Sequence, residues 1–204
     1  MLEEASAYRK QIDVTYIQEE ILTLLAGIEE GAQRTKEIVD SLRTFSRTDE
    51  YSLKPADINK AVLSTLVILR STLPVYIKIK TVLNQLPLVN CYPGQIGQIL
   101  INLLSNSIHA IKSKTGHLNE QITITTNNYP DYIAVEITDT GTGIKPEVKQ
   151  RIFEPFFTTK DVGEGTGLGL SIVFGIIEKH KGQIHVESEL GQGTTFTVQI
   201  PKNL

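Results

Sequence analysis

Two asparagines four residues apart, Asn102 and Asn106, have a spacing that suggests chemistry. They lie in Pro93–Ile111, where apolar residues recur every three or four positions, as in a helix with one buried face. Both amide side chains then point the same way, and their carbonyl oxygens can approach one object together. The helix alone fits a solvated polar face equally well. The apolar stripe is Ile96, Ile99, Leu100, Leu103, Ser107 and Ile111, and the polar stripe is Gln95, Gln98, Asn102, Asn106 and His109.

A carboxylate and two glycines follow a predicted strand, in the sequence Asp139-Thr140-Gly141-Thr142-Gly143. Glycine lets the backbone approach a flat ligand closely. The Asp139 carboxylate could accept a hydrogen bond from an exocyclic amine of the kind that adenine carries. An ordinary turn accounts for this segment equally well when it is taken alone.

A second glycine cluster, GEGTGLGL, runs directly into a predicted helix and contains Gly163, Gly165, Gly167 and Gly169. The N–H groups at a helix start, together with the helix dipole, form an anion site. A dinucleotide-binding fold is disfavoured, because its glycines follow the first strand of a βαβ unit. The preceding segment holds Phe153, Phe156, Phe157 and Lys160; it suggests a lid that brings Lys160 near phosphate oxygens, although simple hydrophobic anchoring is the alternative.

The composition excludes several classes of protein. In 204 residues, 40% are hydrophobic and 21% charged, as in a soluble globular protein. The net charge of −3 gives no support for nucleic-acid binding or a polybasic membrane contact. The single cysteine, Cys91, excludes an internal disulfide. The sequence lacks a signal-peptide pattern and a membrane-span pattern, so a cytoplasmic location is expected, with a membrane anchor elsewhere in a longer protein left open.

The elements that must position these motifs begin with a long helix predicted over about residues 8–47. Its apolar residues recur at bundle spacing and form a stripe that needs a partner. The expected partner is a helix upstream of Met1, forming a hairpin that dimerises into a four-helix bundle; packing on the chain's own domain is the alternative. The stripe comprises Ile17, Ile21, Leu24, Ile28, Gly31, Thr35, Ile38, Leu42 and Phe45.

After a predicted linker at Thr48–Pro55, short helices and strands are expected. Helices are predicted at Asn59–Ser71, Pro93–Ile111 and Leu168–His180, and strands at Val75–Val82, Gln121–Thr126, Tyr132–Thr138, Ile184–Ser188 and Thr195–Ile200. In the first helix the cap is Asp57 or Asn59 and the inward residues are Val62, Leu63, Leu66, Val67 and Leu69. Gly182 is the expected cap after the last helix, and His180 would favour its negative dipole end. Hairpins with helices on one face predict an α+β two-layer sandwich.

The four motifs together resemble the sensor histidine kinases of two-component signalling. Asn102 to Asn106, then DTGTG, FEPFFTTK and GTGLGL, match that family's N, G1, F and G2 boxes in order over about residues 54–201. The upstream sequence EEGAQRTKEIVDSLRTFSR resembles the second helix of the family's dimerisation and phosphotransfer hairpin. The expected organisation is a partial helical domain at 1–48, a linker at 49–54 and an ATP-binding domain at 55–204.

The resemblance implies the Bergerat ATP-binding fold, with ATP and Mg²⁺ as ligands. Asn106 would bind Mg²⁺, and Asn102 would support the phosphates or the metal. Asp139 would bind the adenine amine in a pocket shaped by Gly141 and Gly143, with Thr194 near the adenine. His109 matches a position near phosphate, but a solvated surface histidine is equally expected. The residues closing over the triphosphate would be Lys160, Gly165, Thr166, Gly167, Leu168 and Gly169.

One departure from the family pattern concerns the phospho-accepting histidine. His109, His117, His180 and His185 all lack the family's acceptor context, so the acceptor is expected upstream of Met1. Gyrase-type ATPases of the same fold carry a glutamate base where this chain has Asn102, an amide that cannot take a proton. Transfer to histidine, and then to a response-regulator aspartate, is therefore expected over hydrolysis. A non-catalytic ATP-binding scaffold, or a Ser/Thr kinase of the anti-sigma type, is the alternative.

Overall fold

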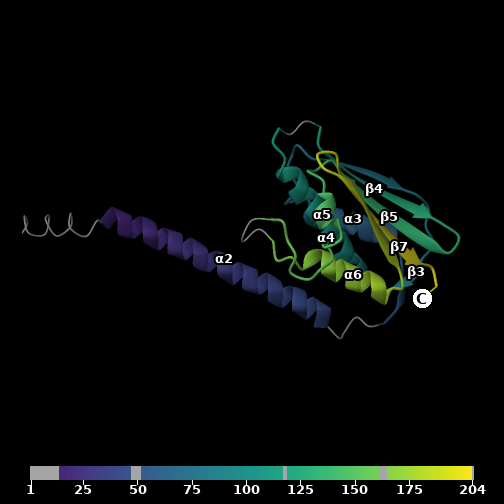
Figure 1. Ribbon diagram of the computed structural model, residues 1–204. Helices are drawn as coiled ribbons and strands as arrows, with labels where there is room; N and C mark the ends of the chain where they lie inside the picture. The colour runs from purple at the N-terminus through teal and green to yellow at the C-terminus, as the bar shows by residue number, and fades with distance from the viewer. Residues whose placement is uncertain (1–13, 47–51, 117–118, 161–164, 204) are drawn as a thin grey trace, which may run out of the picture. The chain divides into compact units, whose positions relative to one another are not determined.

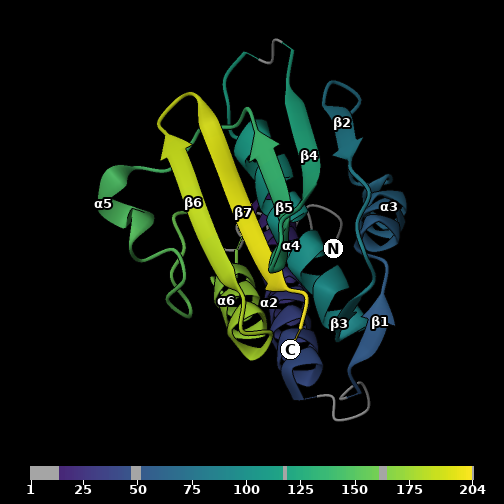
Figure 2. The ribbon, with the colours of Figure 1, turned by 90° about the vertical axis from the view of Figure 1, so that its right-hand side faces the viewer.

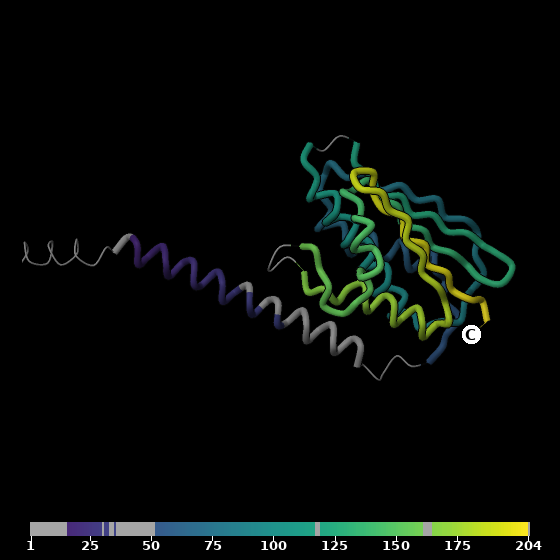
Figure 3. The backbone as a smooth tube through the Cα atoms, viewed as in Figure 1, coloured from purple at the N-terminus to yellow at the C-terminus, as the bar shows by residue number. Residues whose placement is uncertain are grey.

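The computed structural model describes residues 14–46, 52–116, 119–160 and 165–203, and the chain forms two units (Figures 1 and 3). One unit comprises Met1–Ser46 with Thr159–Thr166. The other comprises Arg47–Thr158 with Gly167–Leu204 and holds the sheet. No helix in these described ranges is both long and apolar enough to cross a membrane.

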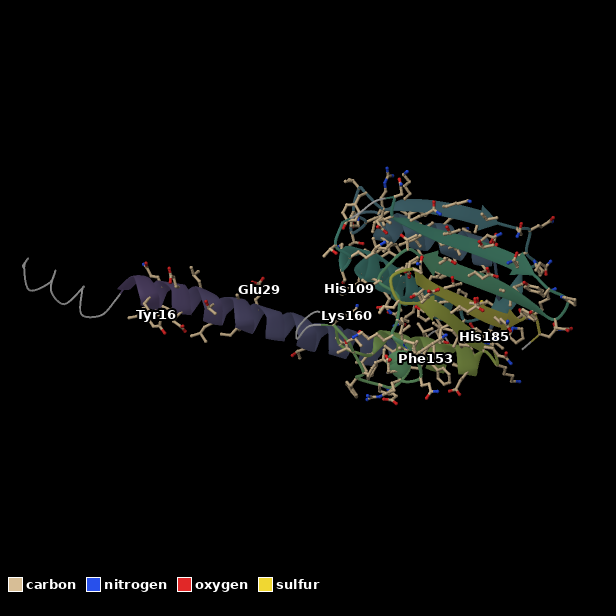
Figure 4. All side chains as sticks on the ribbon, turned by 45° about the horizontal axis from the view of Figure 1, so that its top comes forward. Tyr16, Glu29, His109, Phe153, Lys160 and His185 are labelled. Carbon is tan, nitrogen blue, oxygen red and sulfur yellow. The ribbon has the colours of Figure 1, made fainter. Side chains whose placement is uncertain are left out.

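The N-terminal unit is dominated by the helix α2, Val14–Ser46. Its 33 residues span roughly 50 Å at 1.5 Å per residue, and they confirm the predicted long helix over this range. Tyr16 and Glu29 project from it (Figure 4). Ile17, Ile21, Leu24 and Ile28, members of the predicted stripe, are 42–66% exposed. The apolar stripe of α2 is therefore unburied over Ile17–Ile28.

The second unit is built on a five-stranded sheet with the strand order β2-β4-β5-β7-β6 (Figure 2). The strands are β2 (Lys78–Leu83), β4 (Gln121–Asn128), β5 (Tyr132–Asp139), β6 (Gln183–Glu189) and β7 (Gly193–Pro201). Only β2 and β4 pair in parallel, and the other neighbours are antiparallel. The hairpins β4–β5 and β6–β7 are the two that the turn residues predict.

Three helices cover one face of this sheet, α3 (Ile58–Leu69), α4 (Pro93–Lys112) and α6 (Gly169–Lys179) (Figures 1 and 2). The helices cover the face on which the apolar side chains of the strands lie. Along β4, Ile122 and Ile124 are fully buried, whereas the alternate residues Thr123 and Thr125 are only partly buried. Helix α4 lies in the middle, packing against α3 and α6 and against β5 and β7. Every member of its predicted apolar stripe is buried. The α+β two-layer sandwich is therefore confirmed.

The buried face of α3 differs from the predicted one. Asp57 caps this helix, accepting a hydrogen bond from the Lys60 backbone N–H at 3.1 Å. The helix begins at Ile58, and its buried residues are Ile58, Val62 and Thr65. Leu63 and Val67, expected inward, are 51% and 73% exposed. Ile58, Val62 and Thr65 are spaced by four and three residues, so they share the face of the helix that is buried. Leu63 and Val67 lie outside that face.

Two short strands are absent from the sequence-based assignment, β1 (Lys54–Ala56) and β3 (Val89–Cys91). They pair antiparallel with each other, Lys54 opposite Cys91, so the end of the predicted linker at Thr48–Pro55 is part of a strand. The first strand of the main sheet, β2, begins at Lys78, so the predicted start at Val75 is wrong; Val75 lies outside the strand and is fully exposed. Three-residue strands carry too little alternation for periodicity to detect.

The end of α6 assigns Gly182 a different role from the predicted one. The left-handed residue is Lys181, with a φ of 48°, and its N–H donates to the Glu178 carbonyl at 2.8 Å. The Gly182 N–H donates to the Ile177 carbonyl at 2.9 Å, which completes a Schellman motif. A Cβ on Gly182 would lie 2.3 Å from the Gln199 carbonyl oxygen in β7. Glycine is therefore required by the close approach of the sheet.

His180 makes the predicted contact with the end of α6, but as a neutral ring. It is 1% exposed; its Nδ1 lies 2.7 Å from the Ile176 carbonyl and its Nε2 accepts from the Tyr92 N–H at 3.1 Å. A ring with one donor and one acceptor nitrogen satisfies both contacts in the Nδ1–H tautomer. Desolvation by burial lowers the pKa of His180, with the nearby Lys179 adding to the effect and the hydrogen bond to Ile176 opposing it. His180 therefore meets the helix end through the Nδ1–H group of a neutral ring and not through a positive charge.

Acidification is expected to weaken the fold through His180. Its pKa is lowered from 6.5 in the folded chain, so the unfolded chain binds more protons below that pH. The stability that the neutral ring contributes is present above about pH 6.5 and is lost as the pH falls from there toward the folded pKa. Urea unfolding at pH 7.5 and 5.5 tests this: the stability gap between wild type and His180→Gln should narrow at the lower pH. His185→Gln, at an exposed position on β6, is the control, and an unchanged gap for His180→Gln would contradict the prediction.

Candidate functional site

The Asp139 carboxylate, at the end of β5, is the centre of the candidate site. It is 3% exposed and accepts three hydrogen bonds from three different segments of the chain. Oδ1 accepts from the N–H groups of Gly141 at 2.9 Å and Thr194 at 3.3 Å, and Oδ2 accepts from the Ser107 hydroxyl at 2.9 Å. A carboxylate oxygen has about two lone-pair sites. Oδ2 thus retains a site for a hydrogen bond from a ligand.

Burial and hydrogen bonding act in opposite directions on the Asp139 carboxyl. Desolvation raises its pKa, and this is the largest effect. The hydrogen bonds from Gly141, Ser107 and Thr194 and the positive charge of Lys114 lower its pKa. Each of these groups stabilises the charged form, which accepts hydrogen bonds and does not donate them. The site therefore presents an acceptor inside an apolar core.

The two glycines after Asp139 are required by close packing, each against a different element. A Cβ on Gly141 would lie 2.6 Å from the Ala110 Cβ in α4. A Cβ on Gly143, whose φ is 70°, would lie 2.1 Å from the Glu189 carbonyl oxygen. Between them the Thr142 N–H donates to the Ala110 carbonyl at 3.1 Å. The segment that should shape a ligand pocket is thus held against α4 on one side and the end of β6 on the other.

Thr194, predicted to lie near the ligand, is placed beside Asp139. It pairs with Asp139 across the β5–β7 ladder and is 5% exposed. Its hydroxyl lies 2.9 Å from the Ser188 hydroxyl, which donates to the Gly193 carbonyl and accepts from the Ile144 N–H at 2.8 Å. The end of the β6–β7 hairpin and the segment after Gly143 are therefore joined through Ser188.

Asn102 and Asn106, the asparagine pair of α4, lie in different surroundings. The Asn102 side-chain amide donates to the Gly169 carbonyl at 3.2 Å, so it ties α4 to the first residue of α6. Asn106 is partly buried one turn further along α4, next to Ser107. His109 lies another turn on, its Nδ1 3.3 Å from the Ser113 hydroxyl and its carbonyl accepting from that hydroxyl at 3.0 Å.

The start of α6 has the features of an anion-binding helix end. Leu168 caps the helix through its backbone, without a side-chain hydrogen bond, and the first turn has no acidic residue. The N–H groups of such a first turn point outward with the positive end of the helix dipole. Gly167 has a φ of 68°, and a Cβ there would lie 2.4 Å from the Phe156 backbone, so glycine lets these two segments pack.

The three phenylalanines before α6 differ in their surroundings. Phe153 packs against Phe174 of α6 with ring centroids 5.6 Å apart, and the Arg151 guanidinium lies 4.5 Å from the Phe157 ring centroid. Both phenylalanines contact the core, whereas Phe156 is 70% exposed. Hydrophobic anchoring therefore accounts for Phe153 and Phe157.

Three of the predicted phosphate-side residues belong to the other unit. Lys160, Gly165 and Thr166 fall in Thr159–Thr166, which is grouped with α2. Gly163 lies outside the described residues. The predicted roles of these residues stay predictions.

Three residues that contribute to the site, Ser107, Ala110 and Ser188, are not among the predicted site residues. Ser107 appeared as a member of the apolar stripe, yet it is 1% exposed and donates to Asp139. A hydroxyl inside an otherwise apolar stripe, directly after Asn106, is the signal that could have identified it. Ala110 contributes its carbonyl and its methyl group, and Ser188 contributes a hydroxyl on a strand. No sequence pattern marks either residue.

Comparison with known proteins gives a consistent set of matches. The model of the family described as histidine kinase-, DNA gyrase B-, and HSP90-like ATPase matches residues 92–204. The sensor kinase CckA of Brucella abortus is 37% identical over 196 residues, covering 87% of this chain and 20% of that protein. The sensor histidine kinase ZraS of Escherichia coli is 33% identical over 175 residues, covering 85% and 36%. The chain thus spans about a fifth to a third of these relatives.

Solved structures resemble the chain in the same way. The catalytic domain of histidine kinase ThkA has a TM-score of 0.64 and 34% identity, covering 74% of this chain and 96% of that one. Full-length ShkA in complex with AMPPNP has a TM-score of 0.69 and 25% identity, covering 84% and 36%. ThkA in complex with the response regulator protein TrrA has a TM-score of 0.68 and 28% identity, covering 86% and 49%.

Replacing Gly141 by alanine is expected to destabilise the site. The new Cβ would overlap the Ala110 Cβ and lie 2.8 Å from the Asp139 Oδ1, so the turn must shift, at a cost of about 1–3 kcal/mol. Gly97→Ala is the matched control, because it lies in α4 with nothing within 4 Å, and it should stabilise by about 0.5–1 kcal/mol. Urea unfolding measures both, and equal effects of the two substitutions would contradict the site geometry.

Proposed function

This chain belongs to the family of histidine kinase-, DNA gyrase B- and HSP90-like ATPases, and we propose that it binds Mg-ATP and transfers the γ-phosphoryl group to a histidine. Its ATP-binding domain is of the histidine kinase type, as in sensor kinases such as CckA and ZraS. The single observation that carries the proposal is the buried Asp139 carboxylate with a remaining acceptor site on Oδ2.

Asp139 binds the adenine in this proposal. Oδ2 accepts a hydrogen bond from the exocyclic amine, while the hydrogen bonds from Ser107, Gly141 and Thr194 hold the carboxylate in place. A carboxylate inside an apolar pocket favours a donor at this position over the carbonyl that guanine carries there, since two facing acceptors repel. Gly141, held against α4, shapes one wall, whereas Gly143 acts by packing against β6.

The phosphates lie at the start of α6. The N–H groups at Gly167, Leu168 and Gly169 face them, aided by the dipole of α6 and by an absence of acidic side chains in its first turn. Lys160, Gly165 and Thr166 keep the roles that the resemblance implies, with Lys160 supplying a charge to the phosphoryl oxygens. Asn102 acts indirectly, fixing the start of α6 through its hydrogen bond to the Gly169 carbonyl. In this proposal His109 also lies near the phosphates.

Asn106 fits a magnesium ion that keeps most of its ligands from phosphate and water. Magnesium prefers oxygen ligands, and it is commonly bound through one or two protein groups together with substrate phosphates. Asn106 offers an amide oxygen beside the adenine-side residue Ser107. Within the parts of the chain that the structure describes, no group of three or more His, Cys, Asp or Glu side chains could hold a metal alone. Bound magnesium would neutralise charge on the β- and γ-phosphates.

Transfer is favoured over hydrolysis by the chemistry of Asn102. Hydrolysis needs a base that takes a proton from water, and an amide cannot do so. In the transfer reaction the bond from phosphorus to the β–γ bridging oxygen breaks, a bond to an imidazole nitrogen forms, and ADP leaves. The protein then needs chiefly to position groups and stabilise charge.

The partners in this proposal are a histidine-bearing helix and a response regulator. The exposed stripe of α2 pairs with a preceding helix and a second copy of the protein, forming the bundle that carries the acceptor histidine. The phosphoryl group then passes to a response-regulator aspartate. The structure of ThkA in complex with response regulator TrrA supports this choice of partner. The site of action in this proposal is the cytoplasm, where ATP is available; the free Cys91 fits a reducing compartment.

Asp139→Asn is expected to weaken Mg-ATP binding by tenfold or more, because an amide NH₂ group replaces one acceptor oxygen and hydrogen bonds to a charged group contribute about 1.5–3 kcal/mol. Titration calorimetry on wild type and variant measures the loss. Asp131→Asn, at an exposed position in the β4–β5 turn, is the control and should bind as wild type does. Absence of binding by wild type at millimolar Mg-ATP would refute the proposed function.

Asn106→Asp is expected to abolish or greatly slow phosphotransfer while the fold persists, since a second negative charge beside the triphosphate alters the metal site. The assay supplies γ-labelled ATP and a purified hairpin that carries an acceptor histidine, and measures acid-labile label on the hairpin. Asn90→Asp, at the exposed position of β3, is the matched control. Release of inorganic phosphate without labelling of the hairpin would favour hydrolysis, and wild-type labelling by Asn106→Asp would refute its assignment.

A further inference from the structure

An ion pair between a buried carboxylate and a partly buried lysine lies beside the Asp139 turn and belongs to none of the four motifs. Glu120, just before β4, is 1% exposed, and its Oε1 lies 2.9 Å from the Lys114 Nζ. Lys114, two residues beyond α4, is 25% exposed through its side chain. Removing charges from water is costly, so a buried pair needs further hydrogen bonds to be stable. Thr140 supplies such hydrogen bonds to both members of the pair.

Thr140 is held at each of its polar groups. Its carbonyl accepts from the Lys114 Nζ at 2.7 Å, and its hydroxyl donates to the Glu120 carboxylate. That hydroxyl also accepts from the Gln121 N–H at 3.0 Å, and the Thr140 N–H donates to the Gln121 carbonyl at 3.2 Å. A residue bonded at its N–H, carbonyl and side chain has little freedom to move. Thr140 is therefore fixed to the β4 start and to the end of α4.

Because Thr140 is fixed, its two neighbours in the chain are also held in place. It lies directly between Asp139, the proposed adenine acceptor, and Gly141, whose N–H donates to the Asp139 Oδ1. A shift of Thr140 moves both partners of that hydrogen bond. Lys114 also acts through space, since its positive charge stabilises the Asp139 carboxylate against the effect of burial. Lys114 thus both positions Asp139, through Thr140, and stabilises its negative charge.

We propose that Lys114 and Glu120 are positioning residues that hold the Asp139–Thr140–Gly141 turn in the geometry that selects a purine with an exocyclic amine. The inference rests on the proposed nucleotide binding and adds to it the residues that set base recognition. A pair that only stabilised the fold could lie anywhere between α4 and β4. This pair directs both its charges at the one residue that joins the acceptor to its own hydrogen-bond donor.

The test compares two nucleotides that differ only in the group at issue. ATP and purine riboside triphosphate, which lacks the 6-amino group, are titrated with Mg²⁺ into wild type, Lys114→Met and Glu120→Gln. Wild type should prefer ATP by about tenfold, as expected for one hydrogen bond to a charged acceptor. Both variants should lose most of this preference, mainly through weaker ATP binding, while their affinity for the analogue changes little. Lys114→Arg should restore the preference.

Controls separate base recognition from stability. Lys112→Met removes the exposed lysine that ends α4, two residues before Lys114, and should keep the wild-type preference. Urea unfolding shows which variants fold. If Lys114→Met does not fold, the double variant with Glu120→Gln removes both charges together and leaves no unpaired buried charge. A wild type that binds neither nucleotide defeats the proposed function; a wild type that prefers ATP while the folded variants keep that preference defeats this inference.

Discussion

The structure of the second unit depends on the burial of one carboxylate, Asp139. A buried charge is costly unless hydrogen bonds compensate it, and here the donors come from α4, from the turn after β5 and from β7. Each of these elements must therefore keep its position relative to the end of β5. The same hydrogen bonds that make the carboxylate tolerable in the core leave one acceptor site for a ligand. Stability and recognition thus share one set of contacts.

Helix α4 connects that carboxylate to the rest of the sandwich. Its buried side fills the core between α3, α6 and the sheet, and Ser107 on that side reaches Asp139. Its contacts with α6 lie at both ends of the shorter helix: Asn102 donates to the Gly169 carbonyl, and the Tyr92 N–H just before α4 donates to His180. The start of α6, where anionic groups would bind, is therefore fixed by a helix whose other contacts define the base side of the site.

Much of the fold was predictable because it rests on local patterns. The residue patterns of β4 and β5, the 3.6-residue period of α4 and the cap at Asp57 each involve residues that are close together in the sequence. The failures share a physical cause. Leu63 and Val67 are as apolar as Val62, and only the orientation of α3 on the sheet decides which of them is buried. Gly182 had a valid local explanation as a cap, but the close approach of β7 makes it necessary.

The sequence by itself determined that Asn102, Asn106, Asp139 and the glycine segments occur in the order of one kinase family, because those residues form short contiguous motifs. It also determined the layered fold, since hydrophobic periodicity sets which side of each element is buried. The tertiary structure decided which side chains meet across the chain: Ser107 with Asp139, Glu120 with Thr140, and Tyr92 with His180, separated by 32, 20 and 88 residues. Such pairings depend on strand register and helix orientation, which no local pattern encodes.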